Sequence, residues 1–238
     1  MGIFRRLLLT ALCAGLLAGV FVAVLHQTAT VPLISKAEMF EQAEHAAGAA
    51  MHEHQDAAAT AHGHEAAWAP EDGLERDLYT VAADLLAGIG FALLLAAAIA
   101  VRGSEPGWRG GLLWGLAGFA VFTLAPAIGL PPETPGMAAA PLDARQLWWL
   151  VTVAATGGGL ALIVFTRRPL YAVLGLLLMV LPQLYGAPPP PSDAGGMVPE
   201  ALEHRFVAAV IVTSLLFWAV LGAATGGFYR RFAPQAWH

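Results

Sequence analysis

The chain has few charged residues: Asp, Glu, Lys and Arg make up 12% of its 238 positions, whereas soluble domains usually carry about 25%. Hydrophobic residues account for 58%. This shortage of charge, together with long apolar runs, is typical of membrane proteins and excludes an ordinary soluble domain. We therefore expect the chain to be embedded in a lipid bilayer and to have no nucleic-acid partner.

Cysteine and lysine are almost missing. The single cysteine, Cys13, excludes an intrachain disulfide and a thiolate metal cluster within one chain. The single lysine, Lys36, is not part of a glycine-rich phosphate-binding loop, which excludes ATP hydrolysis by that route. The sequence also lacks a His-Glu-x-x-His motif and a nucleophile elbow. We find no catalytic residues, expect no tightly bound cofactor, and predict that the chain is not an enzyme.

Six apolar segments are candidates for membrane spans, because about 20 helical residues cross a hydrocarbon core of about 30 Å. We predict an all-α fold, a polytopic bundle of six transmembrane helices that forms a single membrane domain over residues 1–238. A cleaved signal peptide is a less favoured alternative for the first segment, which exceeds the usual apolar core of about 7–15 residues. The predicted spans are residues 7–25, 78–101, 111–130, 146–166, 169–186 and 206–228.

Small residues recur at a four-residue spacing within three of these spans. The pairs are Gly15/Gly19, Gly111/Gly115 and Gly222/Gly226. Such pairs allow two helix backbones to approach closely, so we expect them at helix contacts.

Arginine is concentrated on one side of the predicted bundle. An even number of spans places both termini on the same side, which the positive-inside bias assigns to the cytoplasm. We therefore expect cytoplasmic termini and a long periplasmic loop at residues 26–77. The basic residues on the cytoplasmic side are Arg5, Arg6, Arg102, Arg109, Arg167, Arg168, Arg230 and Arg231, against Lys36, Arg76, Arg145 and Arg205 on the other.

The long loop is rich in histidine, alanine and acidic residues. Two His-x-His pairs place imidazoles on the same side of an extended segment, and imidazole with nearby carboxylates suits Co²⁺, Ni²⁺ or Zn²⁺. We predict that the loop captures metal ions; the alternative is an acidic linker that binds metal incidentally. The candidate ligands are His45, His52, His54, His62 and His64.

Three further residues lie near the outer ends of predicted spans: His26, Asp84 and His204. Charged side chains within membrane spans are costly, so each is a candidate for function. Their shared depth predicts a metal intake site below the loop. The alternative is that all three are interfacial residues that reach water.

Short motifs occur along nearly the whole chain in an order that resembles CbtA, the predicted cobalt transporter subunit family of bacteria. The resemblance implies cobalt uptake linked to cobalamin biosynthesis, and a small one-span partner, CbtB, with its own histidine motif. The motifs are His52-Glu53-His54, Leu124-Ala125-Pro126 with Pro131-Pro132-Glu133-Thr134-Pro135-Gly136, Arg145-Gln146-Leu147-Trp148-Trp149, and His204-Arg205-Phe206 with Trp218-Ala219-Val220-Leu221-Gly222.

We expect an inner-membrane subunit that imports a divalent transition metal, with cobalt first and Ni²⁺ or Zn²⁺ as alternatives. An inside-negative membrane favours entry by about 2.3 kcal/mol per charge per 100 mV, so no pump is required. Three other function classes stay open. One is a metal-binding accessory or sensor subunit that carries no ion itself. The others, less favoured, are a membrane enzyme and a structural or interaction protein, which small-residue helix faces would suit.

Overall fold

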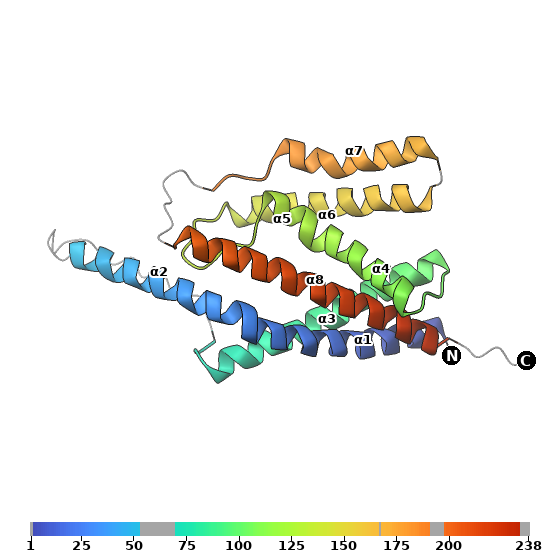
Figure 1. Ribbon diagram of the computed structural model, residues 1–238, viewed down its shortest axis with the longest axis horizontal. Coiled ribbons are helices and arrows are strands. Elements are labelled where there is room, and N and C mark those ends of the chain that lie inside the picture. The colour runs from blue at the N-terminus through green and yellow to red at the C-terminus, as the bar shows by residue number, and fades with distance from the viewer. Residues whose placement is uncertain (1, 53–69, 167, 191–197, 234–238) are drawn as a thin grey trace, which may run out of the picture.

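The computed structural model describes residues 2–52, 70–166, 168–190 and 198–233, without side-chain detail for 44–52. Every described element is helical, which confirms the predicted all-α bundle (Figure 1). The elements are α1 (Ile3–Leu25), the π-helical turn η1 (His26–Thr30), α2 (Val31–His52), α3 (Leu74–Arg102), α4 (Trp108–Phe119), the π-helical turn η2 (Ala120–Leu124), α5 (Ala125–Gly129), α6 (Leu142–Phe165), α7 (Pro169–Tyr185) and α8 (Glu200–Arg231).

Among the described residues, five helical stretches are long and apolar enough to cross a membrane, where the sequence predicts six spans. They are Ile3–Ala43, Leu74–Arg102, Trp108–Gly129, Leu142–Phe165 and Glu200–Arg231. The helix of the remaining predicted span, α7, is apolar but has 17 residues, which is at the lower limit of about 17–25 for a span. The helix is followed by Gly186, whose φ of 90° is a backbone angle that glycine adopts more readily than other residues.

The first helix continues past the predicted end of its span. It runs through η1 into α2, so the first half of the predicted loop 26–77 is helical. Alanine and glutamate are strong helix formers, and both are frequent in this stretch. As a result, α2 projects beyond the ends of its neighbours (Figure 1).

Glycine sets the contact between α1 and α3. A Cβ atom added to Gly15 would lie 2.6 Å from the backbone nitrogen of Ile89, and one added to Gly88 would lie 2.5 Å from the Gly15 carbonyl oxygen. Real Cβ atoms do not tolerate such distances. The two backbones are therefore in direct contact, as the Gly15/Gly19 pair predicts.

The antiparallel pair α4 and α8 is built in the same way. A Cβ atom at Gly222 would lie 2.5 Å from the Cα of Gly115, and one at Gly226 would lie 2.6 Å from the Cα of Gly111. Both predicted small-residue pairs therefore face each other across one contact. The helices α6 and α7 pair similarly. A Cβ added to Gly159 would lie 2.5 Å from the Gly175 carbonyl oxygen, and one added to Gly175 would lie 2.5 Å from the Gly159 carbonyl oxygen.

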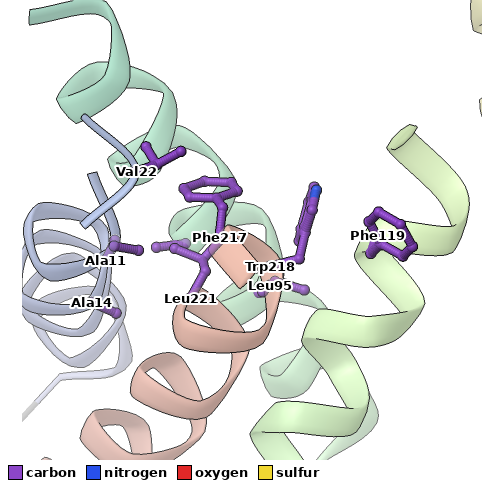
Figure 2. Close-up of a cluster of buried hydrophobic side chains, with 10 residues drawn as sticks. Ala11, Ala14, Val22, Leu95, Phe119, Phe217, Trp218 and Leu221 are labelled. Carbon is purple, nitrogen blue, oxygen red and sulfur yellow. The ribbon is translucent and has the colours of Figure 1, made fainter. Parts of the chain in front are cut away.

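Aromatic rings fill the centre of the bundle, where α1, α3, α4 and α8 meet (Figure 2). The ring of Trp218 lies against Gly118, where an added Cβ would be 2.5 Å from a ring carbon. Trp218 also stacks on Phe122 with ring centroids 5.6 Å apart. Its indole nitrogen donates a hydrogen bond of 3.3 Å to the Thr123 hydroxyl, which satisfies the one polar atom of the ring.

At the end of the bundle where the termini lie, Arg6 joins three segments. Its Nε donates to the Tyr229 carbonyl oxygen at 2.8 Å, and its guanidinium lies over the Tyr229 ring, 3.7 Å from the centroid. Its Nη2 is 2.9 Å from Glu105 Oε1, in the α3–α4 connection. A buried arginine is costly unless it is paired, and here every contact links α1 to another segment.

We expect the change Gly222→Ala to destabilise the protein by about 1–3 kcal/mol, because its methyl group would collide with the α4 backbone. The matched control is Gly227→Ala in the same helix, where no described atom lies within 4 Å of an added Cβ. Alanine favours the helix there, so the control should be neutral or stabilising. Thermal unfolding of the detergent-solubilised protein measures both, and equal midpoints would contradict direct contact of the backbones.

Candidate metal intake site

The structure brings together two of the three predicted intake residues. His26 Nδ1, at the start of η1, lies 3.0 Å from Asp84 Oδ2 on α3. The side chain of His26 is 31% exposed and that of Asp84 is 13% exposed. The pair is therefore accessible from one side while its carboxylate is mostly enclosed by protein.

The glycine contact between α1 and α3 positions this pair. A Cβ at Gly19 would lie 3.0 Å from the Asp84 carbonyl oxygen, so the two helices are as close as their backbones allow at this level. His26 follows two helical turns after Gly19 on α1. Because the backbones are already in contact, the short side chain of Asp84 can span the remaining gap to His26.

The π-helical turn also contributes to the position of His26. The Val31 amide donates to the His26 carbonyl oxygen, the wider bond that defines a π turn, and the Thr30 hydroxyl donates to the same oxygen at 3.1 Å. One extra residue in the turn rotates the following helix relative to α1. Single π turns of this kind are frequent at functional sites.

The chemistry of the pair suits a metal ligand. A carboxylate that accepts a hydrogen bond from one imidazole nitrogen fixes the ring orientation and tautomer, and raises the basicity of the other nitrogen. With Asp84 at Nδ1, the Nε2 atom of His26 is the nitrogen available to a cation. Asp84 therefore acts here as an orienting residue and as a local negative charge.

Further carboxylates continue from this pair toward the N-terminal end of α3. Asp77 accepts a hydrogen bond of 3.0 Å from the Gln27 side chain, which lies next to His26. Farther out, Arg76 pairs with Glu38 of α2 and, at 3.1 Å, with Asp72. We call the carboxylates of Glu38, Asp72, Asp77 and Asp84 the acidic seam, because they follow the contact of α1 and α2 with α3.

His204 is placed apart from the His26–Asp84 pair. Its side chain is 77% exposed, and its Nε2 lies 3.3 Å from Glu200 one turn away on α8. His45 and His52 belong to α2, but their side chains are outside the described part, as are residues His54, His62 and His64. Among the described residues, no group of three His, Cys, Asp or Glu side chains is close enough to hold a metal ion.

A second polar group lies at the N-terminal end of α6. Arg145 Nη2 is 2.9 Å from Glu133 Oε2, and both line a cavity of about 560 Å³ beneath the proline-rich turn, together with Gln146 and Trp149. Because the arginine neutralises the glutamate, this cavity offers a cation less negative charge than the acidic seam does.

The sequence analysis did not identify the seam residues Glu38, Asp72 and Asp77. A signal for Asp77 was present, because Asp77 and Asp84 are seven residues apart and so lie on the same face of one helix. Glu38 had no such signal, because it required knowing that the first helix continues through η1 into α2.

A family model described as "Probable cobalt transporter subunit (CbtA)" matches residues 4–230 of the chain. The match includes His26, Asp84, His204 and the whole acidic seam. No curated protein and no solved structure is similar enough to match.

We expect Asp84→Asn to weaken Co²⁺ binding by the purified protein by about 10–100-fold, the usual cost of losing a carboxylate that orients a metal-binding histidine. The titration is made in a background in which His45, His52, His54, His62 and His64 are alanine, so that the loop does not mask the site. Asp143→Asn, the same chemical change at an exposed position of α6, is the control. Equal affinities for the two variants would show that Asp84 plays no part in binding.

Proposed function

We propose that this chain, which belongs to the CbtA family of probable cobalt transporter subunits, imports a divalent transition metal, cobalt first, through its helical bundle. The observation that carries the proposal is the His26–Asp84 pair at the inner end of the acidic seam. An oriented imidazole beside a carboxylate suits Co²⁺, Ni²⁺ and Zn²⁺ alike. Its position on two membrane-length helices suits an ion on its way into the bundle.

The proposed orientation has both termini in the cytoplasm of a bacterium and the chain in the inner membrane. In Figure 1 the two ends of the chain lie at one end of the bundle, and α2 projects from the other. The α3–α4 and α6–α7 connections lie at the same end as the termini, and the described arginines there far outnumber those at the α2 end, as the positive-inside bias requires. In this orientation the acidic seam meets external cations.

We propose that the histidine-rich segment captures the ion before it reaches the seam. The helix that carries His45 and His52 also carries Glu38, so α2 leads from the segment to the seam. Carboxylates along this route concentrate cations near the His26–Asp84 pair. His54, His62 and His64 would add imidazole ligands beyond the end of α2.

Binding with few protein ligands is suited to transport. An ion must bind well enough to enter and weakly enough to leave, and a single imidazole with one carboxylate leaves most coordination positions to water. The membrane potential then supplies about 4.6 kcal/mol for two charges at 100 mV. The ion is the transported substrate, and the proposal requires neither a catalytic step nor a resident cofactor.

As a transporter subunit, the chain is expected to act with at least one partner. We propose a small CbtB-like protein with one span. The competing function is a metal-binding accessory or sensor subunit. Reconstitution into vesicles, with and without the one-span protein, distinguishes the two functions. If neither preparation takes up cobalt, the accessory function is favoured.

We expect vesicles that contain the functional assembly to take up radioactive cobalt faster when a potassium diffusion potential makes the interior negative. Asp84→Asn should reduce the initial rate at low cobalt about tenfold or more, in line with its expected loss of affinity. The control Asp143→Asn should retain the wild-type rate. A rate that is independent of the potential would contradict entry of the ion as a free charge.

Replacement of His45, His52, His54, His62 and His64 by alanine should raise the cobalt concentration at half-maximal uptake. The maximal rate should be unchanged, because the loop gathers ions and the bundle conducts them. The initial rate measured over a range of cobalt concentrations separates these two quantities. A lower maximal rate at unchanged half-saturation would instead assign the histidines to the conducting path.

A further inference from the structure

A cavity of about 910 Å³ lies between α3, α4 and α6. Its walls are apolar, with Leu94 from α3, Leu113 and Ala117 from α4, and Gly157 and Val164 from α6. Figure 1 shows why space remains there: α4 and α6 diverge toward the end of the bundle where the termini lie. The α6–α7 pair meets the remaining helices mainly through η2 and α5, at its other end.

The depth of the cavity matches one leaflet of a bilayer. Its lining runs along α6 from Val153 to Phe165, about 18 Å at 1.5 Å per residue, and half of a hydrocarbon core is about 15 Å. The inner limit is formed by Phe91, Phe122 and Trp218, which belong to the central aromatic cluster. A membrane-spanning helix of a partner is longer than this space, whereas a lipid chain of one leaflet has the right length.

The mouth of the cavity is cationic. Arg102, the last residue of α3, lines it, with its guanidinium 4.7 Å from the centroid of the Phe165 ring, and Ser104 lies beside it. Among the described residues, no carboxylate pairs with Arg102, and Glu105 of the same connection is already paired with Arg6. An unpaired arginine at the headgroup level above an apolar cavity complements an anionic headgroup with acyl chains below it.

The same features argue against a metal path through this cavity. The apolar walls offer few ligands to replace the water of a divalent ion, and the arginine at the mouth repels cations. The cavity is therefore separate in chemistry from the acidic seam.

We propose that an anionic phospholipid of the leaflet at the termini end occupies this cavity, with its phosphate at Arg102 and Ser104 and an acyl chain along α4 and α6. The lipid fills the space between the α6–α7 pair and the rest of the bundle, which at this end is bridged by the contacts of Phe165 with Trp114 and Arg102. The site is independent of the metal that the protein carries.

Native mass spectrometry of the purified full chain tests the site, with palmitoyl-oleoyl phosphatidylglycerol or phosphatidylcholine as probes of equal chain composition. We expect wild-type protein to retain about fivefold more of the anionic lipid, the effect of one arginine near an anionic headgroup. Arg102→Gln should abolish this preference, and Arg102→Lys should keep it. Arg231→Gln removes an exposed charge from the same end of the bundle but not from the cavity, and should leave the preference intact.

A cavity-filling variant tests the position of the acyl chain. At Gly157 the nearest atom to an added Cβ is a Val121 methyl at 3.7 Å, so Gly157→Leu projects into free space. It should lower retention of both lipids, with an unchanged elution volume as the check on folding. Equal retention of the two lipids by wild type, equal loss of preference in Arg102→Gln and Arg231→Gln, or full retention by Gly157→Leu would each overturn the proposal.

Discussion

Direct contact between helix backbones is the constraint on which the rest of this structure depends. In lipid, apolar side chains gain little by leaving the solvent, so helices associate through close packing. Glycines provide that packing where α1 meets α3, where α4 meets α8 and where α6 meets α7. The distance between α1 and α3 then allows Asp84 to reach His26, and the absence of a side chain at Gly118 makes room for Trp218.

The close helix contacts also determine which polar side chains can pair, because each must find its partner on a neighbouring segment. Arg6 is enclosed where α1 meets α8, and it pairs with the Tyr229 carbonyl and with Glu105. At the opposite end, the carboxylates of the acidic seam lie where α1 and α2 meet α3. The bundle thus keeps a positive end and a negative end, with an aromatic core between them.

The fold class and the glycine contacts of α1, α4 and α8 could be predicted from the sequence, because apolar length and small-residue spacing are local signals. The continuation of the first helix into α2 could not, because hydropathy marks where lipid ends and not where a helix ends. His26 and Asp84 share a predicted depth, and depth alone also suggests His204, whose side chain is instead exposed beside Glu200 of its own helix. The unfilled space beside α6 has no sequence signal, because it arises from the angle between helices.

The number of protein ligands connects the structure to the proposed function. A structural metal site closes four positions with side chains, and such a site holds its ion tightly. The His26–Asp84 pair offers one nitrogen that a carboxylate orients, and the described residues contain no group of three His, Cys, Asp or Glu side chains that could hold a metal ion. Selectivity among Co²⁺, Ni²⁺ and Zn²⁺ therefore has to come from elsewhere. The histidine-rich segment and a partner's own ligands are the two sources compatible with this geometry, and either would complete the coordination only during passage of the ion.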